Sequence, residues 1–417
     1  MATGTHELTA EEADGLLAST ILTDEGRQDP YSAYARLRAG APRWRSGFGS
    51  IVLTRYADGL EALRHPKLGR PEADMDSPAT LSGREPRRAE DEVTMLFLNP
   101  PDHTRIRGLV SRAFTPRRVE ALRPRIAEIL DPVLDRLADG GDVMTELAVP
   151  FPVTVISELL GVPSEGNEHI RPLVHAITAF IDPAADEAAL DRAAVAGLEL
   201  VAYFTDLIAE KRAHPDDGLL SALIEVEEAG DRLSFEELMG NTLLLYAAGF
   251  ETTSNLIGNG LWLFLRNPAE WDRLRTDRSL LPSAVWEVLR ADSPVQLNTR
   301  SVLEPVELFG ERHPRGTNFI ILQGCGNHDE DVYPDPGRFD VGRFLGETPP
   351  PLSFGWGAHH CLGAHLARAE GEIAFGALLD RFPRLTLDTD ALGGATAPRY
   401  RPSFTLRGLE SLPVRVA

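Results

Sequence analysis

The stretch Phe354-Gly355-Trp356-Gly357-Ala358-His359-His360-Cys361-Leu362-Gly363 carries the clearest chemical signal in the chain. The helix-forming run 364–370 follows it, so the sulfur of Cys361 is expected at a helix N-terminus, where negative charge and therefore thiolate is favoured. The three glycines remove side chains that would keep a large flat ligand away from the backbone. A thiolate presented in this way suits a haem iron. The alternative is a structural thiol in a glycine-rich turn.

The composition fits a folded enzyme that needs no disulfides. The 417 residues are 43% hydrophobic, which is ample for a large core, and Cys325 and Cys361 are the only cysteines. We expect no signal peptide, no membrane anchor and a cytoplasmic location. The formal net charge of −21 argues against general nucleic-acid binding. Cys325 lacks the loop context of Cys361 and is predicted to be a small buried residue.

A long helix is predicted over 235–265, because Ser234 and Glu237 form a capping-box pattern at its start. Its middle reads Ala247-Ala248-Gly249-Phe250-Glu251-Thr252-Thr253-Ser254-Asn255. Polar groups inside a buried helix cost on the order of 1 to 3 kcal/mol each if they are unpaired. One interpretation is structural, with threonine hydroxyls bonding to the preceding turn and Gly249 permitting close helix packing. The other interpretation is catalytic.

A further helix is predicted to start within Asn99-Pro100-Pro101-Asp102-His103-Thr104-Arg105-Ile106-Arg107. His103 and Arg107 are four residues apart and share one face of this helix. A ligand with two buried carboxylates would require donors of this kind. The alternative is a solvated basic helix start, since four more arginines are close in sequence, namely Arg105, Arg112, Arg117 and Arg118.

Several other elements are predicted from periodicity and from turn residues. Strands are expected over 43–46, 50–54 and 317–322, and short helices over 30–37, 58–64 and 150–160. The segment 66–98 is rich in Pro, Gly and charged residues and is expected to be a long loop.

Taken together, these segments resemble the cytochrome P450 monooxygenases. The five recurring positions of that family's haem-binding loop are filled by Phe354, Gly357, His359, Cys361 and Gly363. The resemblance extends from about residue 29 to the C-terminus. It implies a mainly α fold with small β-sheets (α+β), shaped as a triangular prism-like single domain over 1–417. It also implies haem b (iron protoporphyrin IX) with Cys361 as the axial ligand of the iron.

The resemblance assigns roles to residues in and around the loop and following helix at 350–370. Glu251 and Thr252 would relay protons, and the oxygen-activation helix would span 235–265. The implied cofactor-binding residues are His103, Arg107, Ala248, Gly249, Arg300, Phe354, Gly355, His359, Cys361 and Gly363. The implied substrate pocket would be bounded by the variable loop at 66–98, with a lid formed by helices at about 164–180 and 186–213. Its side chains would be Leu244, Ala247, Val295, Leu297, Asn298 and Phe404.

Some positions depart from the family pattern, and the sequence assigns them no role. Many bacterial relatives have His in place of Phe250, and His328, Glu330, His360 and His365 are also unusual. Three further charged residues are expected to form a buried structural network, namely Glu287, Arg290 and Arg343.

The implied reaction inserts one oxygen atom from O2 into a small hydrophobic organic substrate by hydroxylation or epoxidation. The implied setting is secondary-metabolite biosynthesis, with polyketides, peptides or terpenoids as substrates of a monomeric enzyme. Because the sequence has no Rossmann fingerprint, electrons are expected from a ferredoxin and an NAD(P)H-dependent ferredoxin reductase, docked on a basic proximal patch. Two alternatives stay open: a peroxide-dependent peroxygenase, and a non-catalytic haem-thiolate sensor or binding protein that has no need of Glu251 and Thr252.

Overall fold

The long helix α11 (Phe235–Arg266) is the central element of the computed structural model, which describes residues 7–416 except 73, 76–92, 112–113, 183, 229–232 and 383. The predicted capping box begins it. The Glu237 N–H donates to the Ser234 hydroxyl, and the Ser234 N–H donates to the Glu237 carboxylate. Every residue from 253 to 264 is buried, so most of the C-terminal half of α11 is enclosed by protein on all sides.

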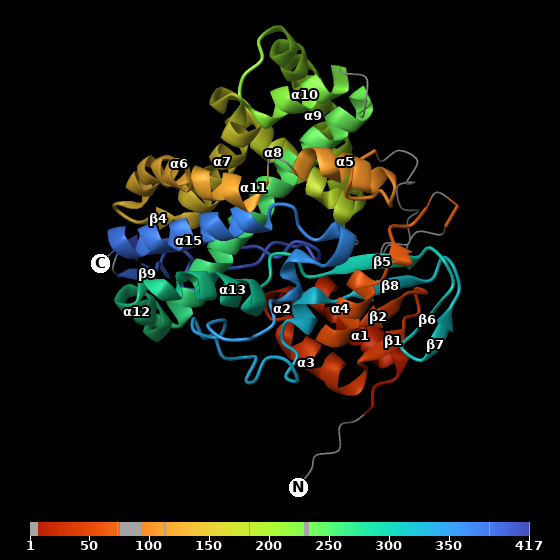
Figure 1. The fold of residues 1–417 in the computed structure, drawn as a ribbon. Coiled ribbons are helices and arrows are strands. Elements are labelled where there is room, and N and C mark those ends of the chain that lie inside the picture. The colour runs from red at the N-terminus through yellow and green to blue at the C-terminus, as the bar shows by residue number, and fades with distance from the viewer. Residues whose placement is uncertain are drawn as a thin grey trace.

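The other helices pack around α11 and beside it. Helices α7, α13 and α15 contact α11 directly, and α6 lies on α15 (Figure 1). In the described part of the chain, no helix combines the length and the hydrophobicity needed to cross a membrane. The bounds are α1 Ala10–Leu22, α2 Asp24–Gln28, α3 Tyr31–Gly40, α4 Tyr56–Arg64, α5 Asp102–Val110, α6 Pro116–Leu134, α7 Pro150–Leu160, α8 Asn167–Ile177, α9 Glu187–Ala213, α10 Leu219–Glu228, α12 Pro268–Thr276, α13 Leu281–Ala291, α14 Gln323–Gly326 and α15 Ala364–Arg381.

The main sheet has the strand order β1-β2-β8-β5-β3, and it lies next to α1, α3 and α4 (Figure 1). Its strands β2 and β8 are parallel, and its other pairs are antiparallel. Two smaller sheets have the orders β4-β10-β9 and β6-β7. The bounds are β1 Arg43–Arg45, β2 Ile51–Leu53, β3 Leu68–Gly69, β4 Gly141–Asp142, β5 Asn298–Val302, β6 Val306–Leu308, β7 Glu311–His313, β8 Asn318–Ile321, β9 Leu385–Leu387 and β10 Pro413–Val416.

The predicted strands at 43–46, 50–54 and 317–322 are confirmed as β1, β2 and β8. The prediction of a loop over 66–98 is wrong for the first residues of that segment, because Leu68 and Gly69 pair with Val302 and Ser301 of β5. Residues 73 and 76–92 of that segment lie outside the described residues. Helices α1, α10 and α12 were not expected from the sequence.

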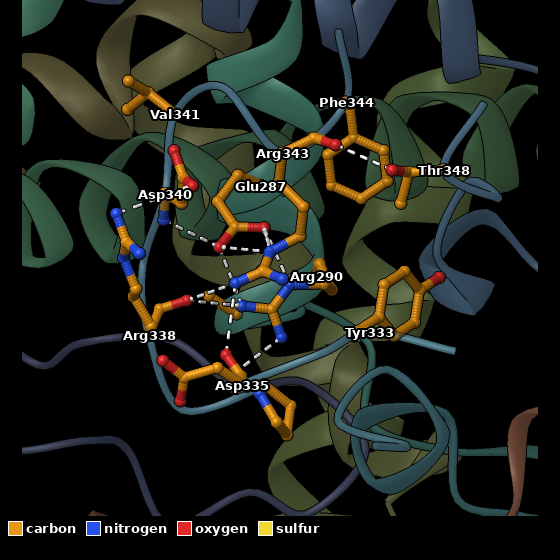
Figure 2. Close-up of polar contacts among 12 residues, drawn as sticks. Glu287, Arg290, Tyr333, Asp335, Arg338, Asp340, Val341, Arg343, Phe344 and Thr348 are labelled. Atoms are coloured by element: carbon orange, nitrogen blue, oxygen red, sulfur yellow. Dashed lines mark hydrogen bonds and ion pairs between the residues drawn. The ribbon is translucent and has the colours of Figure 1, made fainter. Parts of the chain in front are cut away.

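A buried ionic network joins α13 to the segment that precedes the cysteine loop (Figure 2). The side chains of Glu287 and Arg290 are both fully buried, and two hydrogen bonds of 2.7 and 2.8 Å join them. The Arg343 Nε donates to the same carboxylate at 3.0 Å. Arg290 also donates to the carbonyl of Pro336, and Arg343 to that of Pro334. The predicted structural network is therefore confirmed.

Candidate active site

The cysteine loop ends directly before α15. The backbone N–H of Cys361 donates to the carbonyl of Phe354 at 2.8 Å, which closes the loop. Gly355 and Gly357 have φ angles of 61° and 73°, in the left-handed region that favours glycine. A Cβ at Gly357 would lie 2.4 Å from a backbone oxygen, whereas a Cβ at Gly363 would meet no atom within 4 Å. The loop thus leaves open space beside Gly363, as a flat ligand at the sulfur requires.

Cys361 is an exposed residue, whereas Cys325 is buried as predicted. The protein around the Cys361 sulfur is nonetheless dense enough that burial raises the pKa of the thiol. The Gly363 N–H and the positive charge of Arg107 act in the opposite direction without overcoming this effect. A metal ion bound to the sulfur would displace the proton.

A basic cluster lies beside this loop and consists of Arg70, His103, Arg107, Arg300 and His359. The rings of His103 and His359 are 4.3 Å apart. The Arg107 Nη2 donates to the carbonyl of His360 at 2.6 Å, which fastens α5 to the cysteine loop. Helix α5 carries His103 and Arg107, and strand β5 carries Arg300. The fold therefore brings these three predicted residues together beside the cysteine loop.

Arg70 is a member of the cluster that the sequence did not reveal. Strand β3 pairs with β5 through Leu68 with Val302 and Gly69 with Ser301, so Arg70 follows at the position opposite Arg300. Its Nη1 donates to the carbonyl of Thr299 at 3.3 Å. Strand pairing between distant segments creates this neighbourhood, and no local sequence pattern indicates it.

The charges of the cluster indicate the ligand that it suits. Burial, followed by the charges of Arg107, Arg70 and Arg300, lowers the pKa of His103 to about 4. Burial and the same arginines lower the pKa of His359 to about 2, and burial lowers that of Arg300. Among the described residues, neither ring nitrogen of His103 nor the Arg300 Nη2 has a hydrogen-bond partner. Buried donors left in this state are costly, so the cluster fits a ligand with two carboxylates.

Glu251 is a buried carboxylate in the middle of α11, with an exposed fraction of 5%. Its Oε1 lies 2.8 Å from the Arg401 Nη1, and its two oxygens each lie 3.4 Å from the His175 Nδ1. The Arg401 Nη2 is in turn 2.5 Å from the Asn255 Oδ1. Burial acts to raise the pKa of Glu251, but the hydrogen bond with His175 and the charge of Arg401 outweigh it and lower the pKa. Glu251 is therefore ionised at neutral pH.

Thr252 has its hydroxyl 3.0 Å from the carbonyl of Ala248, to which it donates, and its side chain is half-buried. A Cβ at Gly249 would lie 2.7 Å from the Ile156 side chain of α7, which supports the packing interpretation of this glycine. Ala248 is exposed and remains available to line a ligand site. Phe250 is buried and packs edge-on against Tyr246, so it is a core residue.

The six predicted pocket residues do not share one environment. Leu244, Ala247 and Val295 are half-buried. Asn298 accepts a hydrogen bond from Arg300 at 2.6 Å, so it supports the basic cluster. Phe404 is buried in the hydrophobic cluster of α1 and α3, and Leu297 packs against the same cluster. The pocket role of these six residues therefore stays a prediction.

The unusual histidines have identifiable surroundings. His328 is buried, stacks on Tyr31 at 4.2 Å and has its Nε2 3.1 Å from the carbonyl of Ala291, which makes it a packing residue. Burial lowers the pKa of the half-buried His360, while His365 is exposed on α15.

Of the arginines expected on the proximal patch, Arg105 pairs with Glu237, Arg117 and Arg118 are exposed, and Arg112 lies outside the described residues.

Comparison with known proteins identifies the family. The sequence model described as Cytochrome P450 matches residues 51–391. The chain is 41% identical over 397 residues to the cytochrome P450 monooxygenase PikC of Streptomyces venezuelae, covering 93% of this chain and 91% of that protein. It is 39% identical over 406 residues to the 6-deoxyerythronolide B hydroxylase of Saccharopolyspora erythraea, covering 94% and 98%. The ligand-free structure of Mycobacterium smegmatis CYP164A2 has a TM-score of 0.86 and 36% identity, covering 96% and 100%. The chain belongs to the cytochrome P450 family.

Membership of this family confirms the predicted fold, which is mainly helical with small sheets. The protein is an oxidoreductase of the monooxygenase class. Its cofactor contains haem iron, and like its bacterial relatives it binds small substrates and receives electrons from redox partners.

Proposed function

We propose that this protein inserts one oxygen atom from O2 into a small hydrophobic organic substrate by hydroxylation or epoxidation. The proposed setting is secondary-metabolite biosynthesis in the cytoplasm, with the chain acting as a monomeric single domain. We assign haem b as the cofactor, and a ferredoxin with its NAD(P)H-dependent ferredoxin reductase as the electron source. A polyketide is the favoured substrate class, because one similar protein is a 6-deoxyerythronolide B hydroxylase.

The observation that carries this proposal is the basic cluster beside Cys361. A thiol at the start of α15 and a set of buried donors that suits two carboxylates are the two features that haem requires of its site. Cys361 would hold the iron, and His103, Arg107, Arg300 and His359 would hold the propionates, with Arg70 added from the structure. When bound, haem supplies O2 activation, which electron donation from a cysteine thiolate assists.

The residues of α11 would handle protons. Glu251 is held ionised by Arg401, and the neighbouring Thr252 presents a hydroxyl that can both donate and accept. The Thr252 hydroxyl would hold a proton on the exposed side of α11 at Ala248, and Glu251 would replace that proton. Neither role is required of a sensor or binding protein.

Arg300→Met is expected to weaken haem binding while leaving the stability of the apoprotein unchanged or higher. Arg300 is 1% exposed, its Nη1 donates to Asn298 and to the carbonyl of Thr299, and its Nη2 has no partner among the described residues. The burial of a charge without an anionic partner offsets these two hydrogen bonds in the apoprotein. A lost charged hydrogen bond of about 1.5–3 kcal/mol corresponds to roughly a 10- to 150-fold loss of haem affinity. Haem titration and urea unfolding of the apoprotein measure the two quantities separately. Equal losses of haem-binding free energy and of apoprotein stability would contradict the propionate role.

Thr252→Ala is expected to divert electrons from product to hydrogen peroxide. Removing a group that takes part in proton transfer should lower the ratio of product formed to NAD(P)H consumed by about tenfold or more. Thr253→Ala is the matched control, because Thr253 makes the same type of hydrogen bond to the carbonyl four residues earlier, at 3.2 Å, but is buried. The assay uses the holoenzyme with a ferredoxin system and macrolide-type candidates. An unchanged ratio of product to NAD(P)H in Thr252→Ala would refute the relay. Efficient turnover driven by added hydrogen peroxide, without NAD(P)H, would favour a peroxygenase.

A further inference from the structure

The relay proposed above leaves open how its protons arrive. Glu251 is ionised and its side chain is 6% exposed, so it must collect a proton before it can pass one on. Because the carboxylate is enclosed between α11, α8 and the C-terminal segment, bulk water does not reach it freely. A group that touches both the carboxylate and the solvent is therefore needed.

Two side chains with ionisable groups contact the Glu251 carboxylate among the described residues, namely Arg401 and His175. Arginine remains protonated in proteins, so Arg401 can hold the carboxylate but cannot supply a proton. Histidine gains and loses a proton between about pH 5 and 8. The His175 side chain is 52% exposed, whereas that of Glu251 is 6% exposed. His175 thus touches both the solvent and the buried acid.

The position of the His175 Nδ1 suits both protonation states. It lies 3.4 Å from the Glu251 carboxylate and 3.0 Å from the Arg401 Nη1. With a proton, Nδ1–H can donate to Glu251. Without one, the Nδ1 lone pair can accept from Arg401, which Asn255 holds in place. Each protonation state of Nδ1 therefore has a hydrogen-bond partner.

Other charged side chains lie on α8 and on the adjacent helix α9. On α8 itself, Arg171 lies one turn earlier on the same face. On the adjacent helix α9, Asp191, Arg192 and Glu199 line a groove together with Pro172, Leu173 and Ala176 of α8, and His175 is not part of that lining. Among the described residues, the hydrogen-bond contacts of the imidazole are those with Glu251 and Arg401.

We propose that His175 carries protons from solvent to Glu251 during turnover. In this step an N–H bond of the imidazolium breaks and an O–H bond of Glu251 forms, leaving a neutral imidazole and a neutral carboxyl. The neutral imidazole keeps its other proton on Nε2 and has its lone pair on Nδ1, so it regains a proton from the solvent when the half-exposed ring turns Nδ1 outward, and it returns to Glu251 as the imidazolium. This role rests on the proposed function of Glu251. His175 touches neither substrate nor cofactor and acts through Glu251.

His175→Gln is the decisive variant, because glutamine can accept a hydrogen bond from Arg401 but cannot carry a proton. His169→Gln is the matched control, since His169 is exposed on the same helix and lies on a different face from His175. In the holoenzyme, His175→Gln should lower coupled turnover by about tenfold and remove its pH dependence between about pH 5 and 8. It should also raise the solvent deuterium isotope effect. Added imidazole should restore coupling in His175→Ala.

A double-mutant cycle provides a readout that does not depend on turnover. The coupling between His175→Gln and Glu251→Gln in urea unfolding should be larger at about pH 5.5 than at about pH 8, because only the imidazolium attracts the carboxylate. If Glu251→Gln lowers the ratio of product formed to NAD(P)H consumed while His175→Gln behaves like His169→Gln, the role of His175 is refuted and the relay stands. If Glu251→Gln has no effect either, the relay itself fails.

Discussion

Cys361→Ala is expected to abolish monooxygenase activity, which is the largest effect of any single substitution in this chain. The side chain is the only thiol of the loop before α15, and the basic cluster beside it offers nitrogen donors to carboxylates but no second thiolate. Without the sulfur, the electron donation that favours O–O cleavage is lost. The cluster is intact in this variant, so some haem should still bind, with altered ligation. Haem content and NAD(P)H-driven product formation measure the two effects.

Cys325→Ala is the matched control for that experiment. Cys325 is the other cysteine, it is buried, and its thiol donates weakly to the carbonyl of Tyr34 at 3.5 Å. Burial raises the pKa of its thiol to about 12, so it stays protonated. Its replacement should leave haem content and activity close to wild type. Activity that survives Cys361→Ala, or that is lost in Cys325→Ala, would contradict the assignment of the ligand.

Glu287→Gln is expected to cause the largest loss of stability. The glutamine keeps the shape of Glu287 but removes the charge that Arg290 and Arg343 share in the network of Figure 2. Breaking a buried ion pair from one side typically costs about 3–5 kcal/mol, because the remaining charge is left uncompensated. With a total free energy of unfolding of roughly 5–15 kcal/mol for proteins in general, this loss is severe. Urea unfolding of the holoenzyme measures it.

An exposed ion pair of similar geometry serves as the control. Arg125 and Glu158 form two parallel hydrogen bonds of 2.7 and 2.9 Å, but both side chains are largely exposed. Glu158→Gln should therefore cost only about 0–1 kcal/mol. A cost for Glu287→Gln as small as that for Glu158→Gln would show that the network contributes little to stability.

Local sequence patterns were sufficient for the parts of the molecule that depend on local rules. The capping box of Ser234 and Glu237, the glycines of the cysteine loop and the helical face of His103 and Arg107 are each defined within a few residues of chain. Their structures follow from backbone geometry and from side-chain spacing, so they could be predicted.

Arg70 and the surroundings of Glu251 depend on contacts between distant segments, whereas the missed helix α1 has a local signal, the capping box of Thr9 and Glu12. Arg70 joins the basic cluster only through the register of β3 with β5. His175, Glu251 and Arg401 come from α8, α11 and the C-terminal segment, and no sequence spacing connects them.

The central claim is that Cys361 provides a thiolate ligand to haem iron. The visible spectrum of the purified wild-type protein, reduced and exposed to carbon monoxide, tests it most directly. We expect the long-wavelength Soret band that is typical of haem-thiolate proteins. A protein that binds no haem, or a band typical of histidine ligation, would contradict the claim.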